Sequence, residues 1–328
     1  MPLTDVKLFA LKGSASLGAS VAANLGLPIA PHEEREFEEG EHKARPLEAV
    51  AGGDVYVVHS LNASPDQSPN DKLCRLLFFI GALKDAGAGR VTAVSPYLCY
   101  ARKDRRTKPF DPVITRYAAA LFEAVGTDAV AALEVHNPAA FQNAFRRRTV
   151  ALTATPIFIE HVKPLAAPGG LCVVSPDTGG AKRAEQFRKA LEQALRQPVG
   201  SSLVEKHRSG GVVSGNLFAG DVKGKTALII DDMISSGATL ARAAEAAKKA
   251  GAERVLALVA HGLFAEGSEK AVLNPALDGL IITDSVQPPL LKQGAMANKV
   301  TILSCAPLLA EAIRRLHENR GLSDLLVF

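Results

Sequence analysis

Residues Thr226 to Leu240 read TALIIDDMISSGATL, and this segment determines the class of fold that we expect. It begins with an apolar run, continues with the acidic pair Asp231-Asp232, and then enters a loop of small residues. Apolar runs rich in β-branched residues are typical of a buried strand in a parallel sheet. Thr239 is a candidate cap for the helix that the following Ala-rich residues predict. A strand, a loop and a helix in this order indicate an α/β unit.

The polar part of this segment predicts a ligand site, because ligands of open α/β sheets bind beyond the carboxyl ends of the strands. Small residues entering a helix point backbone N–H groups at one place, which suits a phosphate. The acidic pair is suited either to accept hydrogen bonds from vicinal hydroxyls or to hold a divalent cation through water. A phosphate beside a diol describes ribose 5-phosphate. The residues that we expect to bind it are Asp231, Asp232, Ser235, Ser236, Gly237, Ala238 and Thr239.

Short apolar runs alternate with helical patterns along the rest of the chain. The expected strands are residues 54–60, 90–97, 128–136, 170–177, 225–233, 254–262 and 279–285. The expected helices are residues 71–86, 113–125, 181–195, 239–250 and 307–319. Strands that alternate with helices in this way predict parallel sheets covered by helices.

The length of 328 residues favours two domains. The two halves also resemble each other, since RVTAVSPY from Arg90 and RVLALVAHG from Arg254 both follow a turn that contains Ala and Gly. A cluster of proline and glycine at 151–170 marks the link between them. We therefore predict an N-terminal domain at 1–150 and a C-terminal domain at 151–328, with a C-terminal helix at about 306–320 that can pack back on the first domain.

Composition argues against several classes of partner. The net charge of +4 is too small to indicate nucleic acid or a membrane surface. No apolar run approaches the roughly 18 residues of a membrane span, and the N-terminus lacks the pattern of a signal peptide. The four cysteines form no CxxC pair and indicate neither disulfides nor a zinc site. We expect a cytoplasmic protein that binds neither nucleic acid nor membrane.

The opening segment resembles the motif of type I phosphoribosyltransferases and of ribose-phosphate pyrophosphokinase, also called phosphoribosyl pyrophosphate synthetase. Further motifs favour the second family and follow its order along nearly the whole chain. They are the pyrophosphate loop SPDTGGAKRA (175–184), the nucleotide-binding signature PYLCYARKDRR (96–106), the adenine-side loop FEEGE (37–41), the metal-proximal EVHN (134–137) and the basic EKHR (205–208). The resemblance implies two similar type I phosphoribosyltransferase-like domains, each a mainly parallel sheet flanked by helices.

The same resemblance implies an enzyme of nucleotide biosynthesis, a transferase of the kinase type. It would move the diphosphoryl group of ATP to the 1-hydroxyl of ribose 5-phosphate, giving phosphoribosyl pyrophosphate and AMP, with Mg²⁺ as cofactor. A transfer of this kind depends on positioning, magnesium and positive charge on the oxygens that gain charge. The family also implies a homo-oligomer, built from dimers and as large as a hexamer, with an ATP site shared across a subunit interface.

Individual roles follow from the resemblance. The implied catalytic residues are Lys206, Arg208 and His136. The implied ATP-binding residues are Phe37, Glu39, Glu41, Arg102, Lys103 and Asp104, and the pyrophosphate loop is Asp177, Thr178, Gly179 and Gly180. The implied metal-proximal residues are His136 and Asp177. Because a Gly- and Ser-rich stretch follows Arg208, we expect a mobile loop at 206–215 that closes over the phosphates.

Several positions depart from the family pattern and keep two alternatives open. Glu134 stands where the family usually has Asp, His207 where it has Arg, and Ser235-Ser236 where it has an Asp-Thr pair; Lys12 replaces a small residue. One alternative is a phosphoribosyltransferase that consumes phosphoribosyl pyrophosphate and shares only the ribose 5-phosphate loop. The other is a non-catalytic regulatory relative that assembles with an active partner.

Overall fold

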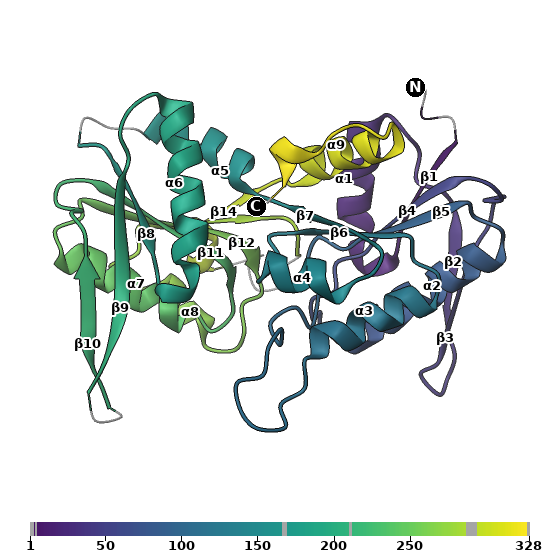
Figure 1. The fold of residues 1–328 in the computed structure, drawn as a ribbon, viewed down its shortest axis with the longest axis horizontal. Helices are drawn as coiled ribbons and strands as arrows, with labels where there is room; N and C mark the ends of the chain where they lie inside the picture. Colours follow the sequence, from purple (N-terminus) through teal and green to yellow (C-terminus); the bar gives the residue numbers. More distant parts are fainter. Residues whose placement is uncertain (1–2, 4, 166–168, 210–211, 287–293, 327–328) are drawn as a thin grey trace. The chain divides into compact units, whose positions relative to one another are not determined.

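The structure is a computed structural model, and it describes residues 3, 5–165, 169–209, 212–286 and 294–326 (Figure 1). The side chains of residues 206–217 lie outside this description. The chain divides into two compact units. Unit 1 comprises Met1–Thr153 and Ser304–Phe328, and unit 2 comprises Ala154–Leu303. Residues 304–328 therefore belong to unit 1, although they follow unit 2 in the sequence.

A parallel sheet forms the centre of unit 1, with strand order β1-β4-β5-β6-β7. Its strands are β1 (Val6–Ala10), β4 (Asp54–Val58), β5 (Arg90–Val94), β6 (Ala129–Leu133) and β7 (Arg148–Leu152). The predicted strands at 54–60, 90–97 and 128–136 are confirmed as β4, β5 and β6. The sequence patterns did not predict the two edge strands β1 and β7.

Helices cover both faces of this sheet (Figure 1). They are α1 (Ala15–Leu25), α2 (Pro69–Asp85), α3 (Ile114–Ala124), α4 (Pro138–Ala144) and α9 (Ala306–His317). The first and last of them, α1 and α9, lie side by side on one face, and α2 and α3 cover the other. Phe9 of β1 meets Phe79 of α2 edge to face, with ring centroids 5.2 Å apart. Buried aromatic contacts of this kind fix how the helix sits on the sheet.

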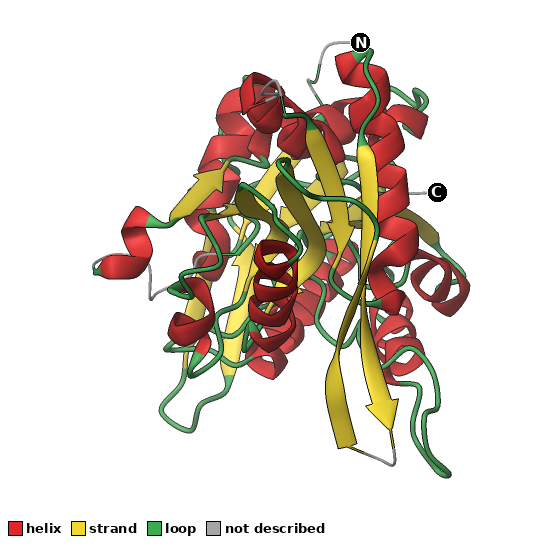
Figure 2. Ribbon diagram, turned by 90° about the vertical axis from the view of Figure 1, so that its left-hand side faces the viewer, coloured by secondary structure: helices red, strands yellow, loops and turns green. Residues whose placement is uncertain are grey.

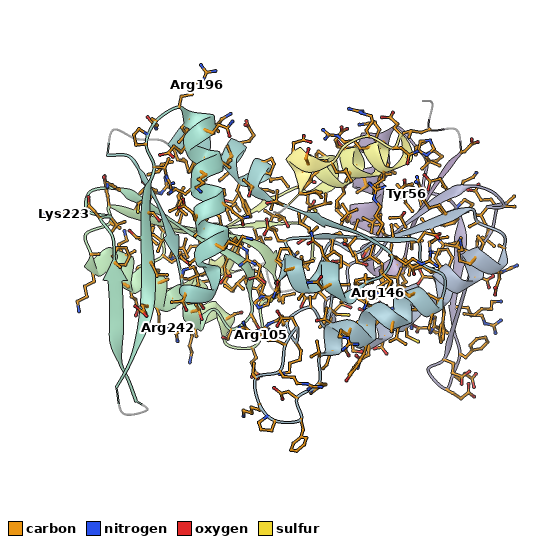
Figure 3. The ribbon with its side chains drawn as sticks, viewed as in Figure 1. Tyr56, Arg105, Arg146, Arg196, Lys223 and Arg242 are labelled. Atoms are coloured by element: carbon orange, nitrogen blue, oxygen red, sulfur yellow. The ribbon has the colours of Figure 1, made fainter. Side chains whose placement is uncertain are left out.

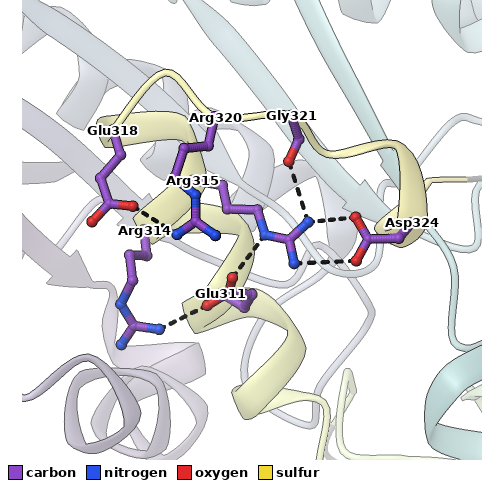
Figure 4. A network of polar contacts seen from close by, with 7 residues as sticks. All are labelled: Glu311, Arg314, Arg315, Glu318, Arg320, Gly321 and Asp324. Atoms are coloured by element: carbon purple, nitrogen blue, oxygen red, sulfur yellow. Dashed lines mark hydrogen bonds and ion pairs between the residues drawn. The ribbon is translucent and has the colours of Figure 1, made fainter.

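Charged side chains fasten the end of α9 (Figure 4). Arg315 donates to Glu311 within the helix and to Asp324 beyond it. Basic residues in the last turn also interact favourably with the negative end of the helix dipole. The helix and the turn that follows it are thus held as one piece.

Asp54, at the start of β4, joins α9 to the sheet through three donors. Arg90 Nε donates to Asp54 Oδ1 over 2.7 Å, the Tyr56 hydroxyl donates to Oδ2 over 3.0 Å, and His317 Nδ1 lies 2.9 Å from the same oxygen. Tyr56 is fully buried inside unit 1 (Figure 3). Burial alone would raise the pKa of Asp54, but hydrogen bonds from Arg90 and then His317 outweigh it, and that pKa lies below its ordinary value.

A small antiparallel hairpin, β2 (His32–Glu36) and β3 (His42–Pro46), packs against α2. Arg75 of α2 donates to Glu36, and Phe78 of α2 stacks on His42 with ring centroids 5.4 Å apart. Neither strand was predicted, because the segment HEEREFEEGEHKARP carries charged residues on both faces and no apolar alternation. Tertiary contacts with α2, rather than local pattern, stabilise this hairpin.

Unit 2 is built on a second sheet, with order β10-β9-β8-β11-β12-β13-β14. Its strands are β8 (Leu171–Ser175), β9 (Gly200–Ser209), β10 (Val212–Ala219), β11 (Thr226–Ile234), β12 (Arg254–Gly262), β13 (Gly279–Thr283) and β14 (Val300–Leu303). All neighbours are parallel except β9 and β10, which form a long antiparallel ribbon (Figure 2). The predicted strands at 170–177, 225–233, 254–262 and 279–285 are confirmed.

The helices of unit 2 are α5 (Thr155–Val162), α6 (Ala181–Leu195), α7 (Ala238–Lys249) and α8 (Ser268–Val272). Helix α6 packs on β8 and β9, whereas α7 packs on β11 and β12. Small Ala side chains of α7, such as the buried Ala243, Ala244 and Ala247, let it approach the sheet closely. In the described part of the chain, no helix is both long and apolar enough to cross a membrane.

Candidate active site

Two polar loops meet at one edge of the unit 2 sheet. One follows β8 and contains Asp177 to Gly180, and the other follows β11 and contains Ser235 to Thr239. Strands β8 and β11 are hydrogen-bonded parallel neighbours, so their carboxyl ends open onto the same edge. The predicted pyrophosphate loop and the predicted ribose 5-phosphate loop are therefore adjacent in space.

The acidic pair lies within the last residues of β11. Asp232 is buried, with 2% of its surface exposed, and Asp231 is half-buried. The backbone N–H of Asp232 donates to Asp231 Oδ1 over 2.9 Å. Burial, reinforced by the negative charge of Asp232, raises the pKa of Asp231 well above its ordinary value. The pair thus resists carrying two negative charges at the same time.

Arg183 supplies the positive charge beside this pair. It lies in the first turn of α6, and its guanidinium nitrogen is 3.2 Å from Asp232 Oδ1 and 3.6 Å from Asp231 Oδ1. This residue links the loop after β8 to the acids of β11. It was not among the predicted site residues, because nothing in a helical stretch reveals that β8 and β11 are neighbours. The strand order is the missing information.

The loop after β11 has the backbone that a close ligand needs. Gly237 adopts a φ of 75°, and a β-carbon there would lie 2.5 Å from Ala271 Cβ. Only glycine fits without displacement. Ser235 is half-buried, and Ser236 and Ala238 are exposed. The predicted cap is wrong by two positions, since the N-cap of α7 is Gly237 and Thr239 lies inside the first turn.

Thr239 has a different contact instead of a capping bond. Arg242 donates to its Oγ1 over 3.1 Å, from one turn further along α7 (Figure 3). The first backbone N–H groups of α7 therefore have no side-chain cap among the described residues. Open N–H groups at a helix start are what an anion binds.

The loop after β8 folds as a short 3₁₀ turn, Thr178–Gly180, before α6 begins. Asp177 Oδ1 accepts from the Gly180 N–H over 3.1 Å and so caps this turn. Thr178 and Gly179 are exposed, whereas Gly180 is buried, and a β-carbon at Gly180 would lie 3.1 Å from Ser175 Oγ. Asp177 thus has a structural task, and its other carboxylate oxygen has no hydrogen bond among the described residues.

The described residues of the predicted loop at 206–215 are instead strand residues, with 206–209 in β9 and 212–215 in β10. The backbone of Lys206 pairs with Asn216, and that of Arg208 pairs with Val213. Glycine and serine in this stretch favoured a loop, but the cross-strand ladder outweighs their low strand propensity. The side chains of Lys206 and Arg208 lie outside the described residues, so their catalytic role stays a prediction.

The predicted adenine-side residues lie at the tip of the β2–β3 hairpin. The Phe37 N–H donates to the Glu41 carbonyl over 2.8 Å, which closes the turn, and Gly40 within it has a φ of 85°. Phe37 is 39% exposed, with the Arg35 guanidinium 5.1 Å from its ring centre. Glu39 and Glu41 are exposed. An exposed aromatic ring beside a cation is free to stack on a planar ligand.

The predicted phosphate-contacting residues lie elsewhere in unit 1, on the long loop between β5 and α3. Arg102 and the neighbouring Arg105 are both exposed. Lys103 donates to Asp111 and, over 3.3 Å, to Thr107. In Figure 1 this loop and the tip of the β2–β3 hairpin lie on opposite sides of α3, so one chain does not bring them together.

The same loop meets the segment that follows β6. Asn137 Nδ2 donates to Asp104 Oδ2 over 2.5 Å, while Asn137 Oδ1 accepts from the Ala140 N–H and caps α4. His136, directly before it, is exposed. The structure thus brings Asp104 and His136 into one neighbourhood at the carboxyl ends of β5 and β6.

Glu134, a departure from the family pattern, has an identifiable structural role. It is buried, its φ is 44°, and its Oε1 accepts from the Thr153 hydroxyl over 2.7 Å. A positive φ is strained for a residue with a long side chain. The longer side chain of Glu reaches Thr153 at this position.

Comparisons with known proteins agree with this arrangement. Residues 6–126 match the family described as the N-terminal domain of ribose phosphate pyrophosphokinase, and residues 214–327 match the phosphoribosyl synthetase-associated domain. The chain is 36% identical over 327 residues to a ribose-phosphate pyrophosphokinase of Vibrio vulnificus (strain YJ016), covering 98% of this chain and 99% of the relative. It is 34% identical over 324 residues to that of Clostridium perfringens (strain 13 / Type A), covering 98% and 97%.

A solved structure also resembles the whole chain. The phosphoribosylpyrophosphate synthetase from Mycobacterium smegmatis superposes with a TM-score of 0.85 and 30% sequence identity, covering 96% of this chain and 100% of that one. Similarity over nearly the full length of both chains covers both units. The predicted fold class, parallel sheets flanked by helices in phosphoribosyltransferase-like domains, is confirmed.

Proposed function

The chain belongs to the ribose-phosphate pyrophosphokinase family, and from this premise we propose that it converts ATP and ribose 5-phosphate to AMP and phosphoribosyl pyrophosphate. The 1-hydroxyl oxygen attacks the β-phosphorus of ATP. The bond from that phosphorus to the oxygen bridging to the α-phosphate breaks, and the hydroxyl proton is released. The observation that carries the proposal is the shared edge of β8 and β11, where a phosphate-type loop, an acidic pair and a second Gly-rich turn adjoin.

Ribose 5-phosphate is the acceptor that suits the loop after β11. The open N–H groups at the start of α7 and the hydroxyls of Ser235, Ser236 and Thr239 would bind its phosphate. The carboxylates of Asp231 and Asp232 would accept hydrogen bonds from the sugar hydroxyls. Arg183 holds both carboxylates in place and offsets part of their charge.

Magnesium is the cofactor that we propose, with His136 and Asp177 as the residues near it. When bound, Mg²⁺ neutralises charge on the transferred phosphates. The described residues contain no cluster of three or more His, Cys, Asp or Glu side chains that could hold a metal by themselves. That donor set fits an ion that keeps several waters and binds mainly through substrate phosphates, as Mg²⁺ does.

The ATP site, in this proposal, is completed between subunits. Phe37, Glu39 and Glu41 would contact adenine, while Arg102, Lys103, Asp104 and His136 would contact the phosphates. The hairpin tip and the basic loop lie on opposite sides of α3 within one chain, which supports a donor site built from two copies (Figure 1). A dimer-based homo-oligomer follows, and sedimentation as a monomer under assay conditions would contradict it. The cytoplasmic location remains a prediction.

One assay tests the reaction itself. The purified protein is incubated with MgATP and ribose 5-phosphate, and AMP is quantified against the Lys206→Ala/Arg208→Ala variant. We expect equal amounts of AMP and phosphoribosyl pyrophosphate from the wild-type protein and a loss of at least roughly 100-fold in the variant, since each cation would stabilise charge in the transition state. If the wild-type protein forms no more AMP than the variant does, the proposed activity is excluded.

A further inference from the structure

A second polar cluster lies in unit 1, at the carboxyl ends of the neighbouring strands β1 and β4. After β1, a 3₁₀ turn at Lys12–Ser14 leads into α1. His59 and Ser60 follow β4, and Lys72 lies in the first turn of α2. This edge corresponds in kind to the ligand-binding edge of unit 2, yet no step of the proposed reaction uses it.

Three side chains of this cluster are more than nine-tenths buried and carry polar atoms with no hydrogen-bond partner among the described residues, and of these atoms His59 Nε2 is the one that is completely buried. Lys72 is 1% exposed, and its ammonium group makes no hydrogen bond or ion pair there; burial lowers its pKa, and the charge of Asp66 offsets this only in part. Gln67 is 7% exposed, and its side-chain amide is likewise unpaired. His59 is 1% exposed, and its Nε2 has no partner. A buried polar group without a partner is costly, and a buried charge more so. Three together indicate that a bound group completes the cluster.

The three side chains converge on Gly13. A β-carbon at that position would lie 3.2 Å from Gln67 Oε1, 3.2 Å from His59 Cε1 and 3.3 Å from Lys72 Cε. Glycine therefore keeps the backbone of the turn close to all three groups. Gln67 Oε1 and the carbon atoms bonded to the polar ends of His59 and Lys72 thus gather around the start of α1.

Hydrogen bonding around Ser14 allows a tautomer in which His59 is a donor to the cluster. Ser14 Oγ accepts from the Ser60 N–H over 2.8 Å and lies 3.3 Å from His59 Nδ1. When the Ser14 hydroxyl hydrogen is donated to Nδ1, the proton of the neutral ring sits on Nε2 and faces the cluster. Burial lowers the pKa of His59 to about 3, so the ring is neutral at neutral pH. The cluster then offers donors from Lys72, His59 and the Gln67 amide.

We propose that Gly13, His59, Gln67 and Lys72 form a binding site for a small oxyanion of single negative charge, of the carboxylate class. The donors match an oxyanion, and Lys72 is the only buried cation among these four residues. Glu34 stands nearby, with its Oε1 accepting from the Lys12 N–H over 2.6 Å and lying 3.0 Å from His32 Nε2. Its negative charge disfavours a dianion. The burial of Lys72, His59 and Gln67 to more than nine-tenths favours a small ligand over one that carries a sugar or nucleoside.

The test uses formate as the probe and the imidazole of His59 as a local reporter. Formate is titrated into the full chain labelled with ¹⁵N-histidine, at constant ionic strength set with sodium chloride. The His59 signals are identified by their absence in the His59→Gln variant. We expect a saturable shift of these signals, weakened roughly 10- to 100-fold in Lys72→Met, because a charge-assisted hydrogen bond is lost. The control Lys43→Met makes the same charge change at an exposed site and should leave the affinity unchanged.

A second pair of measurements separates a binding defect from a folding defect. Gly13→Ala keeps every charge but places a methyl group among the donors, so it should weaken formate binding while the chain stays folded. Formate should raise the Tm of the wild-type protein but not that of Lys72→Met, which without formate should be at least as stable as the wild type.

Three outcomes would overturn the proposal. One is the absence of any formate-dependent shift at His59. Another is a shift of equal affinity in Lys72→Met. The third is tighter binding of phosphate at pH 8, or of ribose 5-phosphate, than of formate at His59, which would assign the site to a dianion or a phosphoester.

Discussion

Asp54 in unit 1 and the pair Asp231-Asp232 in unit 2 are partly or fully buried carboxylates that lie near an arginine, yet the pKa of Asp54 and that of Asp231 shift in opposite directions. Asp54 receives hydrogen bonds from Arg90, Tyr56 and His317, and its pKa lies below the ordinary value. The acidic pair shares Arg183, at 3.2 and 3.6 Å, and the pKa of Asp231 lies above the ordinary value.

The opposite pKa shifts indicate different roles. Asp54 stabilises the fold, whereas Asp231 and Asp232 are suited to bind a ligand. The single negative charge of Asp54 is stabilised by hydrogen bonds from Arg90, Tyr56 and His317, so its ionisation is favourable in the folded protein. Asp231 is largely buried beside the negative charge of Asp232, so ionisation of both carboxylates is unfavourable until a ligand hydroxyl or cation arrives. Such under-compensated groups are typical of functional sites.

The largest expected effect is on stability, in Asp54→Ala. Removing this carboxylate leaves Arg90 and His317 facing each other without an anion. We expect the free energy of unfolding to fall by about 3 kcal/mol, as for other broken buried ion pairs. Urea unfolding at pH 7 measures it. The control Glu318→Ala removes a carboxylate that pairs with the exposed Arg320, and it should change stability much less than Asp54→Ala does.

The acidic pair should behave in the opposite way. In Asp231→Ala/Asp232→Ala, we expect the affinity for ribose 5-phosphate to fall roughly 10- to 100-fold, about 1.4 to 2.7 kcal/mol, because hydrogen bonds to charged acceptors are lost. The affinity for ATP should change much less, and the free energy of unfolding should not fall by more than about 1 kcal/mol, since a like-charge repulsion is also removed. Calorimetry with each ligand checks this. An equal loss for both ligands would show that the pair is assigned wrongly.

The free energy of unfolding should decrease toward low pH because of Asp54 and toward high pH because of Asp231. A lowered carboxyl pKa, as at Asp54, gives stability that is present above the ordinary carboxyl pKa and is lost as pH falls through the folded value. A raised pKa, as at Asp231, gives stability that is fully present below the ordinary carboxyl pKa and is lost as pH rises through the folded value. Urea midpoints followed from about pH 2 to pH 8 should therefore show a smaller decline on the acid side in Asp54→Asn and a smaller decline toward pH 8 in Asp231→Asn. If both variants show the same pH dependence of the urea midpoint as the wild-type protein, the proposed difference between Asp54 and Asp231 is wrong.

The smallest expected effect concerns one donor of Asp54. His317→Gln removes the hydrogen bond from α9 but leaves Arg90 and Tyr56 in place, so we expect a loss of about 1 kcal/mol in the free energy of unfolding. Arg320→Gln, at an exposed position of the α9 network in Figure 4, is the matched control and should cost about 0.5 kcal/mol or less. If the two variants lose equal stability, the contact between His317 and Asp54 does not contribute to stability.

The spacing of apolar residues in the sequence correctly predicted the strands and helices in which that spacing is most regular. The segment TALIIDDMI is β11, and RVLALVAHG is β12, because both run through the interior of a sheet where each face must be apolar. The acidic pair and the loop after it were located for the same reason, as the polar end of such a strand. Helices α2, α3, α6 and α7 were found within two residues at each end.

Features that depend on neighbours distant in sequence were not predictable. The β2–β3 hairpin has no apolar face of its own, and its stability comes from Arg75 and Phe78 of α2. Arg183 was missed since its contact with Asp232 exists only because β8 lies next to β11. The cap of α7 was misplaced because a glycine with positive φ, rather than a hydroxyl, begins that helix.

The division of the chain has a consequence for the order of folding during synthesis. Unit 2 is one continuous segment that ends at Leu303, whereas unit 1 needs residues from both ends of the chain. Asp54 and His317 are 263 positions apart, so a ribosome must make almost the entire protein before these two side chains can form their contact. The first 153 residues therefore emerge with the face that α9 covers still open, while unit 2 can fold as soon as it leaves the exit tunnel. Premature termination shortly before α9 would release a product with a complete second half and an unfinished first half.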